Sequence, residues 1–249
     1  MKLENKIAIV TGAASGFGEA IAHRFVENGA RVVIADLNAE KAAAVARALR
    51  GETRAIAVRT DVSSRSDIDK LLAEATRFFG TPDIIVNNAG YTHKNRPLLE
   101  VDEATFDRVF AVNVKSIYHM VHAAVPAMRD NGGGVMLNVG SVAGIRPRPG
   151  LTWYNGSKGA ANTLSKSLAV ELAPWKIRVN AICPVIGVTG MLEDFMGMPD
   201  TPENRTKFLG SIPLGRFCEA DDVAQAALYL ATADFITGIE LPVDGGRTI

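Results

Sequence analysis

The chain has 249 residues, of which 47% are hydrophobic and 22% are charged, as is usual for a globular protein with one substantial core. Its 27 Lys and Arg residues equal its 27 Asp and Glu residues in number, so the net charge gives no reason to expect nucleic acid or a membrane surface as a partner. The longest apolar runs are too short to span a bilayer.

Short runs rich in Val, Ile and Ala alternate with helical patterns along the chain. The expected strands are 6–10, 31–35, 54–59, 83–86, 134–139, 176–182 and 238–243, and the expected helices are 16–28, 39–49, 65–79, 102–128, 153–172 and 220–230. Continuously apolar strands indicate a sheet that is covered on both faces. We therefore expect an α/β fold of one domain, residues 1–249, with a doubly wound parallel sheet of Rossmann type.

The segment 184–213 interrupts this alternation, because it is rich in Gly, Pro and Met and follows a strand. A long irregular segment in a compact domain is often a binding loop or a lid. We expect this segment to cover the substrate. The alternative is a surface connection without a role in binding.

The chain start and the cysteines bear on location. The first residues lead directly into an expected strand and lack the features of a secretory signal. Cys183 and Cys218 do not have the spacing of metal ligands, and reduced thiols fit a reducing compartment. We expect a cytoplasmic protein without a metal site.

A glycine-rich turn, TGAASGFG from Thr11 to Gly18, follows the first expected strand and opens the first helix. Gly12 permits a tight turn, Gly16 lets the backbone approach a phosphate, and Gly18 permits close packing of helix on sheet. The helix start presents unpaired N–H groups to a pyrophosphate. Such turns also occur in methyltransferases, so the turn alone does not specify a dinucleotide.

Asp36 ends the second expected strand, 18 residues beyond Gly18. A carboxylate there accepts hydrogen bonds from ribose hydroxyls and repels a 2′-phosphate, so NAD is favoured over NADP. The alternative for Asp36 is a helix cap, although Asn38 is better placed for one. Asp61 follows the third strand with Val62, and it is either an adenine contact or a turn residue.

Tyr154 and Lys158 lie four residues apart at the start of an expected helix and so share one face. A free tyrosine, with a pKa of about 10, is a poor base near neutral pH. We expect the ammonium of Lys158 to lower the pKa of Tyr154 toward the working range. Ser141, which ends the preceding strand, is placed to polarise a carbonyl. Each residue alone would also fit a purely structural role.

Taken in order, the motifs TGxxxGxG, NNAG at 87–90, Asn113, Ser141 and YxxxK make the chain resemble the classical short-chain dehydrogenase/reductase family from Lys6 to Gly246. The resemblance implies a catalytic tetrad of Asn113, Ser141, Tyr154 and Lys158. In it, Tyr154 acts as acid or base, Lys158 holds the nicotinamide ribose, Ser141 positions the substrate oxygen and Asn113 holds a water.

The expected cofactor is NAD, and the candidate binding set extends around the glycine turn and the strand ends. It comprises Gly12, Ser15, Gly16, Phe17, Gly18, Asp36, Asp61, Val62, Asn88, Ala89, Gly90, Tyr154, Lys158, Pro184, Ile186 and Thr189. Val185 stands where the family commonly has glycine, which predicts a different backbone path beside the nicotinamide.

Three segments are expected to form the substrate pocket, and the principal candidates are Ala143, Arg148, Trp153, Met191 and Phe195. Further candidates are Tyr91, His93, Lys94, Asn95, Arg96, Arg146, Leu192, Met196 and Met198. The Met and Phe residues suit an adaptable apolar cover. The basic residues predict either an anion-binding mouth or ordinary surface charge and oligomer contacts.

The resulting hypothesis is an NAD-dependent oxidoreductase that interconverts a secondary alcohol (small, cyclic or a sugar) and its ketone. One alternative is a 3-oxoacyl-thioester reductase of the same family. Others are a catalytically idle NAD-binding regulator and a methyltransferase, which would not need Tyr154 and Lys158. The resemblance also implies a homotetramer, with which the apolar faces of the expected helices 102–128 and 153–172 are consistent.

Overall fold

The computed structural model describes residues 2–49 and 53–249. Its strands are β1 (Ile7–Thr11), β2 (Arg31–Asp36), β3 (Ala55–Arg59), β4 (Ile84–Asn87), β5 (Gly134–Val139), β6 (Ile177–Pro184) and β7 (Glu240–Val243). They form one parallel sheet in the order β3-β2-β1-β4-β5-β6-β7. The predicted Rossmann-type sheet is confirmed.

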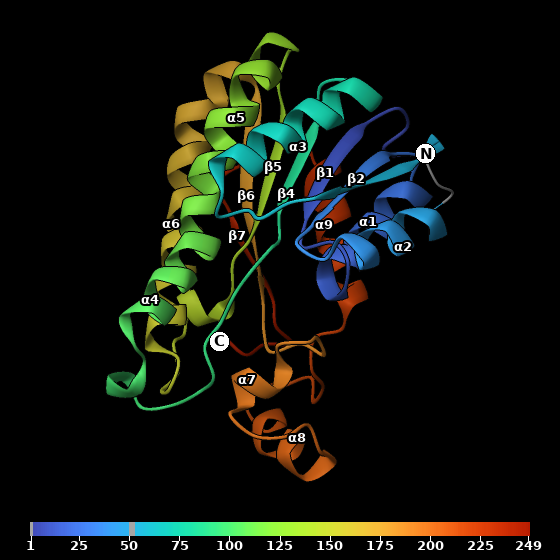
Figure 1. Cartoon of the computed structure of the whole chain (residues 1–249). Helices are drawn as coiled ribbons and strands as arrows, with labels where there is room; N and C mark the ends of the chain where they lie inside the picture. The colour runs from blue at the N-terminus through green and yellow to red at the C-terminus, as the bar shows by residue number, and fades with distance from the viewer. Residues whose placement is uncertain (1, 50–52) are drawn as a thin grey trace.

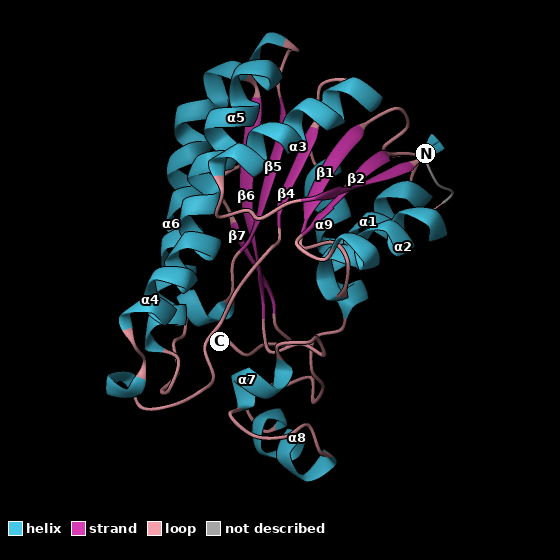
Figure 2. Ribbon diagram, viewed as in Figure 1, coloured by secondary structure: helices cyan, strands magenta, loops and turns pink. Residues whose placement is uncertain are grey.

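The described α-helices are α1 (Gly16–Glu27), α2 (Ala39–Ala48), α3 (Arg65–Phe78), α4 (Glu103–Phe110), α5 (Ser116–Asp130), α6 (Thr152–Leu172), α7 (Leu192–Met196), α8 (Pro202–Leu209) and α9 (Ala220–Thr232). Short 3₁₀ segments span Leu98–Glu100, Val142–Gly144 and Ala173–Trp175. Helices α1, α2 and α9 cover one face of the sheet, and α3, α5 and α6 cover the other (Figures 1 and 2).

The core follows from the alternation of side chains along buried strands. Ala8 and Val10 of β1 pack into the cluster beneath α1, α2 and α9, whereas Ile9 between them packs into the cluster beneath α3, α5 and α6. Both faces of each central strand are therefore apolar, because each needs a helix layer. This explains why the strands appear in the sequence as continuous Val, Ile and Ala runs.

The strand order reverses between β1 and β4, because successive strands are added outward in opposite directions from this pair. At such a point the loops that follow the two strands diverge and leave a crevice at the carboxyl edge of the sheet. The turn after β1 and the NNAG segment after β4 both lie there. The topology thus brings together two motifs that are about 75 residues apart in sequence.

Two expectations about helices are wrong in part. The stretch 102–128 is not one helix, because a π-helical turn at Ala111–Lys115 separates α4 from α5. The segment 184–213 is not irregular throughout, since it contains α7 and α8. These two helices lie beyond the end of the sheet, apart from the other helices (Figure 1).

Candidate active site

A cavity of 590 Å³ lies beyond the carboxyl ends of the central strands, a volume usual for a ligand site. All but one of the candidate cofactor residues line it; Gly18 does not. Ser141, Tyr154 and Lys158 line it as well, as do the candidate substrate residues Ala143, Arg148, Met191 and Phe195. The structure therefore brings residues from six strand ends and α6 to a single cavity.

The glycine turn is held close to the loop after β4. Gly12 has φ +63°, and a Cβ there would lie 2.8 Å from the Ala89 Cα. The Asn88 Nδ2 donates hydrogen bonds to the carbonyls of Thr11 (2.8 Å) and Gly12 (3.1 Å). A Cβ on Gly18 would lie 2.3 Å from the Gly12 carbonyl oxygen, so Gly18 lies beneath the turn. Glycine is needed here for close approach.

Helix α1 begins at Gly16 with its N-terminus toward the cavity, which Gly16 and Phe17 line. Ser15 precedes the helix with extended backbone, but its side chain does not cap the helix. Uncapped N–H groups and the partial positive charge of a helix start favour an anion. This end of α1 is therefore suited to a diphosphate.

The Asp36 carboxylate is held at the end of β2 by two backbone donors. The N–H of Ala14 donates to its Oδ2 at 3.0 Å, and the N–H of Asn38 donates to its Oδ1 at 2.9 Å. Asp36 is not the cap of α2, because Asn38 accepts the hydrogen bond from the N–H of Lys41. The carboxylate is thus fixed between the glycine turn and the cavity.

Asp61 is a turn residue that also lines the cavity, and its contact with adenine stays a prediction. Its Oδ1 accepts from the N–H (2.9 Å) and the hydroxyl (2.6 Å) of Ser63, as a turn residue does, and it also lines the cavity with Val62. Burial alone would raise the pKa of Asp61. Hydrogen bonds from Ser63 and the charge of Arg108, 3.6 Å away, lower it below its usual value.

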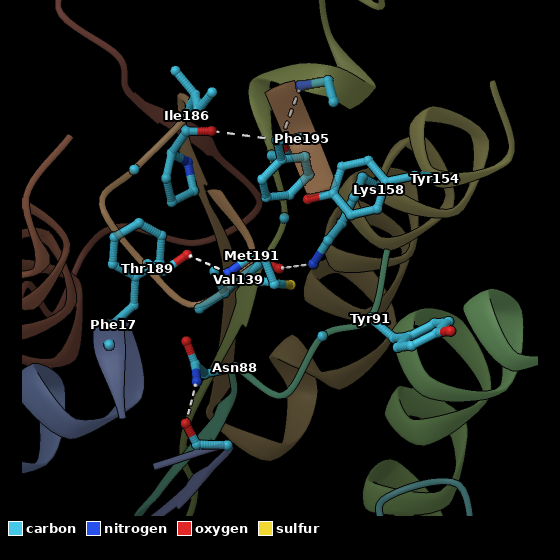
Figure 3. A pocket seen from close by; sticks show the side chains of 18 of the residues that line it. Phe17, Asn88, Tyr91, Val139, Tyr154, Lys158, Ile186, Thr189, Met191 and Phe195 are labelled. Carbon is cyan, nitrogen blue, oxygen red and sulfur yellow. Dashed lines mark hydrogen bonds between the residues drawn. The ribbon is translucent and has the colours of Figure 1, made fainter. Parts of the chain in front are cut away.

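Tyr154 and Lys158 reach from α6 into the cavity (Figure 3). Both are only 5% exposed, and Ser141, after β5, is 8% exposed. The Lys158 Nζ donates to the carbonyl of Val139 at 2.7 Å and lies 5.9 Å from the centre of the Tyr154 ring. The Ser141 Oγ accepts from the N–H of Ala143 at 3.0 Å. A phenol, an ammonium and a hydroxyl are therefore assembled at one end of the cavity.

The expectation that Lys158 lowers the pKa of Tyr154 is wrong for the protein alone. Burial raises the pKa of Tyr154 to about 12, although a hydrogen bond with Ser141 and the charge of Arg148 oppose the rise. Burial also lowers the pKa of Lys158 to about 8. The phenol is therefore protonated at neutral pH, and the buried ammonium is easily deprotonated.

Asn113 does not line the cavity but lies behind it, 3% exposed, in the π-helical turn. Its Oδ1 accepts from the N–H of Tyr91 at 2.8 Å, and its Nδ2 donates to the Tyr91 carbonyl and the Ser157 hydroxyl, both at 2.9 Å. The side chain therefore bonds outside its own helix. It ties the loop after β4 to α6 at Ser157, less than one helical turn from Tyr154. A π-helical turn is often found at functional sites.

The segment after β6 runs along the cavity from Pro184 to Thr189. The N–H of Val185 donates to the carbonyl of Val243 at 3.1 Å, so the pairing with β7 continues one residue beyond β6. The carbonyl of Ile186 accepts from the N–H of Cys218. The Thr189 Oγ1 accepts from the N–H of Met191 (Figure 3). Val185 fits because no positive φ is required there.

Several expected substrate residues lie elsewhere. Trp153 does not line the cavity, because its ring packs edge-on against Phe106 with 5.4 Å between centroids, and its Nε1 donates to the Leu98 carbonyl. Of the substrate candidates between 91 and 96, only Tyr91 lines this cavity. His93, Lys94 and Arg96 line a separate cavity, and the N–H of Asn95 donates to the Asp194 carbonyl in α7. Leu192, Met196 and Met198 pack into or against the core.

Other lining residues were not predicted from the sequence. Lys207, Phe208 and Ser211 come from α8 and the turn after it, and Arg247 comes from the segment after β7. No motif marks them, because their position depends on how α8 and the last residues fold over the strand ends. The Pro, Gly and Met residues in 184–213 predicted that this segment covers the substrate. They did not predict which side chains of α8 line the cavity.

Among the described residues there is no group of three or more His, Cys, Asp or Glu side chains suited to a metal ion. Cys183 and Cys218 are buried free thiols, and burial raises the pKa of each to about 12. In the described part of the chain, no helix is long and apolar enough to cross a membrane.

Comparison with known proteins gives matches over nearly the whole chain. The family described as enoyl-(acyl carrier protein) reductase matches residues 12–248. The 4-formylbenzenesulfonate dehydrogenase of Comamonas testosteroni is 52% identical over 252 residues, covering 100% of both chains. The 2-(R)-hydroxypropyl-CoM dehydrogenase of Xanthobacter autotrophicus is 39% identical and covers 98% of this chain and 99% of its own length.

Among solved structures, the crystal structure of a 3-ketoacyl-(acyl-carrier-protein) reductase from Brucella melitensis, complexed with NADH, superposes with a TM-score of 0.93. Its sequence is 45% identical, and the match covers 99% of this chain and 100% of that one. The glycine turn, the buried tyrosine and lysine, and the sheet order described above thus occur in a chain that is similar throughout to oxidoreductases.

Proposed function

The chain belongs to the short-chain dehydrogenase/reductase family, and from this premise we propose that it interconverts a secondary alcohol and its ketone with NAD as cofactor. The observation that carries the proposal is one cavity with two ends. Asp36 and the glycine turn line one end, and Ser141, Tyr154 and Lys158 line the other. An idle nucleotide-binding protein would not need a buried phenol and ammonium at the second end.

The residues present fit NAD. The α1 start offers N–H groups that Ser15 does not cap, and Gly16 at this start lines the cavity without a side chain that would keep a phosphate from the backbone. Asp36 would accept hydrogen bonds from the adenosine ribose, since its carboxylate is fixed and lines the cavity. The similarity to a structure complexed with NADH supports the same choice. When bound, NAD accepts or supplies the hydride.

The chain's own part in the reaction is to hold the substrate oxygen and move its proton. In reduction, the Tyr154 phenol donates its proton to the carbonyl oxygen of the substrate. The raised pKa of Tyr154 keeps the phenol protonated at neutral pH, as this role requires. In oxidation, the phenolate takes the proton back from the hydroxyl. Ser141 stabilises the substrate oxygen, because its hydroxyl lies in the same cavity and hydrogen-bonds with Tyr154.

Lys158 places its ammonium group near Tyr154, with 5.9 Å between the Nζ and the centre of the ring. Its ammonium is anchored to the Val139 carbonyl, so its position is fixed before substrate binds. Lys158 lines the same end of the cavity as Tyr154, where the family resemblance implies that it holds the nicotinamide ribose. Asn113 positions rather than reacts, because it fixes the Tyr91 backbone on one side and Ser157 of α6 on the other.

Relatives named as dehydrogenases of alcohols support a secondary alcohol as substrate. The 2-(R)-hydroxypropyl-CoM dehydrogenase and the cyclopentanol dehydrogenase of Comamonas are 39% and 35% identical to this chain. A second candidate function is reduction of a 3-oxoacyl thioester, because the structure with TM-score 0.93 is named for that activity. Asp36 favours the first, since NAD serves oxidation more often than NADP does.

The proposal is tested by following NADH formation with small, cyclic and sugar alcohols, with NADP in parallel reactions. We expect turnover of a secondary alcohol with NAD and at least a tenfold lower kcat/KM with NADP. Tight binding of NAD without turnover of any alcohol, ketone or 3-oxoacyl thioester would contradict the proposal and favour a catalytically idle NAD-binding regulator.

We also propose that the chain assembles as a homotetramer. On the outer helices, Tyr118 of α5 is 56% exposed and Val170 of α6 is 80% exposed. Large apolar side chains exposed on neighbouring helices are suited to contact with a second copy. Sedimentation of the purified protein measures the state directly.

A further inference from the structure

Apart from Lys158 beside Tyr154 and Arg108, which lies 3.6 Å from Asp61, the charged residues that line the active-site cavity are separated by sign. Its acidic side chains among the described residues are Asp36 and Asp61, which follow β2 and β3 at the end assigned to adenosine. At the other end lie Arg146, Arg148, Lys207 and Arg247, which we call the cationic wall. The chain as a whole has no net charge, so this separation is a local property of the cavity.

The cationic wall lacks Asp and Glu partners, although Arg146 also donates to the main-chain oxygen of Ile249 at 3.5 Å. In the part of the chain that the structure describes, no ion pair joins any of its four members to an Asp or Glu side chain. Nearby cations behave differently: Arg205 is 2.5 Å from Asp200, and Arg216 is 2.6 Å from Asp222. The members of the wall instead donate to neutral oxygens or to the chain end. Lys207 donates to the Asn204 Oδ1, and Arg146 donates to the carbonyl of Arg247.

Arg148 is the member nearest the reacting groups. Its Nη2 donates to the main-chain oxygen of Phe195, and its guanidinium lies 5.3 Å from the centre of the Phe208 ring. Burial lowers the pKa of Arg148, and the positive charge of Arg247 lowers it further. Two like charges are thus held near each other in a partly buried place. A bound anion would relieve both the repulsion and the loss of hydration.

One aromatic residue, Phe195, contacts both the proton donor and the wall. The Phe195 ring packs edge-on against Tyr154, with 5.1 Å between centroids, and the Phe195 main-chain oxygen accepts from Arg148. Met191 and Leu151 add apolar surface to the same part of the cavity. A substrate that reaches both Tyr154 and Arg148 therefore meets apolar side chains between its two polar contacts.

We propose that the substrate alcohol carries a fixed anionic group, a carboxylate or a sulfonate, on a compact apolar body, and that Arg148, with Lys207 and Arg247, binds this group. The proposal rests on the proposed function, because it concerns the substrate of that same site. A guanidinium binds such oxyanions through two parallel hydrogen bonds, which a neutral substituent cannot accept with equal strength.

A thioester carrier is the other source of negative charge at this end. Its phosphates are separated from the reacting carbon by a long flexible arm, so they would reach the exposed rim rather than Arg148. Of the wall, Arg146 and Lys207 are exposed whereas Arg148 is half-buried beside Tyr154. The inward position of Arg148 favours the compact anion.

The test uses a pair of alcohols with the same shape and different charge, 4-(1-hydroxyethyl)benzenesulfonate and 4-(1-hydroxyethyl)benzenesulfonamide, with NAD at saturation. We expect the wild-type kcat/KM to be at least about tenfold higher for the sulfonate. Arg148→Met should lower kcat/KM for the sulfonate about 10- to 100-fold more than for the sulfonamide, mainly through KM. The ratio of the two substrates separates charge recognition from any general loss of activity.

Lys207→Gln, on the exposed face of α8, should lower the same ratio by a smaller factor and is less disruptive to packing. Arg65→Gln is the matched control, because it removes an exposed cation of α3 that pairs with Asp69 and does not line the cavity. It should leave the ratio unchanged. An equal kcat/KM for the two alcohols, or a ratio that Arg148→Met does not change, would overturn the proposal. A higher kcat/KM for reduction of acetoacetyl-CoA than for reduction of the two corresponding ketones, 4-acetylbenzenesulfonate and 4-acetylbenzenesulfonamide, would overturn it as well.

Failure of the proposed function has a different signature. If neither alcohol nor ketone is turned over, calorimetric binding of 4-acetylbenzenesulfonate and 4-acetylbenzenesulfonamide to the NADH-loaded protein still tests the wall. Tighter binding of the sulfonate, lost in Arg148→Met, would support the anion site while the oxidoreductase assignment fails. Equal binding of the two compounds would overturn the anion site itself.

Discussion

Lys158 carries a positive charge in a buried position that water hardly reaches. We therefore expect Lys158→Met to make the protein more stable at pH 7. Burial lowers the pKa of Lys158 from 10.5 to about 8. At about 1.36 kcal/mol per pKa unit, the charged form costs the folded state about 3 kcal/mol. Methionine fills nearly the same space without the charge. The variant also loses the hydrogen bond to the Val139 carbonyl, which lowers its stability by about 1 kcal/mol. The expected net gain is about 2 kcal/mol.

The pH dependence gives the sharper result. Between pH 8 and 10.5 the unfolded chain holds the Lys158 proton more tightly than the folded chain does, so wild-type stability rises with pH through this range. Tyr154 acts in the opposite direction only above pH 10, because its pKa is raised from 10.0 to about 12. The advantage of Lys158→Met should therefore shrink by about 2 to 3 kcal/mol between pH 7 and pH 10.

Urea unfolding of both proteins at the two pH values, followed by circular dichroism at equal protein concentration, measures the difference. Lys166→Met is the control, since Lys166 lies on the same helix with its side chain 56% exposed and paired with Glu240. That variant should show no gain at pH 7. A Lys158→Met protein that is less stable than wild type at pH 7, or a difference that does not change with pH, would refute the reasoning.

Other parts of the site give further expectations. Gly18→Ala should cost about 1 to 3 kcal/mol in urea unfolding, because its Cβ would lie 2.3 Å from the Gly12 carbonyl oxygen. Gly210→Ala meets nothing within 4 Å and should be neutral, so equal stability of the two variants would contradict the packing argument. Asp36→Asn keeps an acceptor for the Ala14 N–H but removes the charge, and it should raise the NADP to NAD ratio of kcat/KM by about tenfold; an unchanged ratio would count against the ribose contact. Because the raised pKa keeps Tyr154 protonated, alcohol oxidation should accelerate with pH from 7 to 9 while ketone reduction does not, and a flat oxidation profile would argue against the phenolate as base.

The parts of the fold that follow from local sequence were predicted well. Buried strands have a short apolar period and are followed by turn residues, so the ends of β1, β2 and β5 were located to within one residue. Their order in a doubly wound sheet then brings the glycine turn, Asp36 and Ser141 to one edge. The same logic brought Tyr154 and Lys158 into the cavity, since a helical spacing of four residues fixes a common face.

The errors concern features that depend on tertiary contacts. The π-helical turn at 111–115 has no sequence period of its own, and Asn113 within it bonds to the loop after β4. Trp153 adjoins the tyrosine in sequence, but the helical turn directs it toward Phe106, away from the cavity. The raised pKa of Tyr154 could not be foreseen either, because it depends on burial by Phe195 and neighbouring segments that are distant in sequence.

The central claim is that Tyr154 transfers the proton that accompanies the hydride. Tyr154→Phe removes only the hydroxyl and retains the ring that packs against Phe195. The most direct measurement is turnover of the preferred alcohol by this variant, with NAD affinity measured in parallel by calorimetry. We predict that kcat falls about 10²- to 10⁴-fold while the Kd for NAD stays within about twofold. Turnover within tenfold of wild type would contradict the assignment.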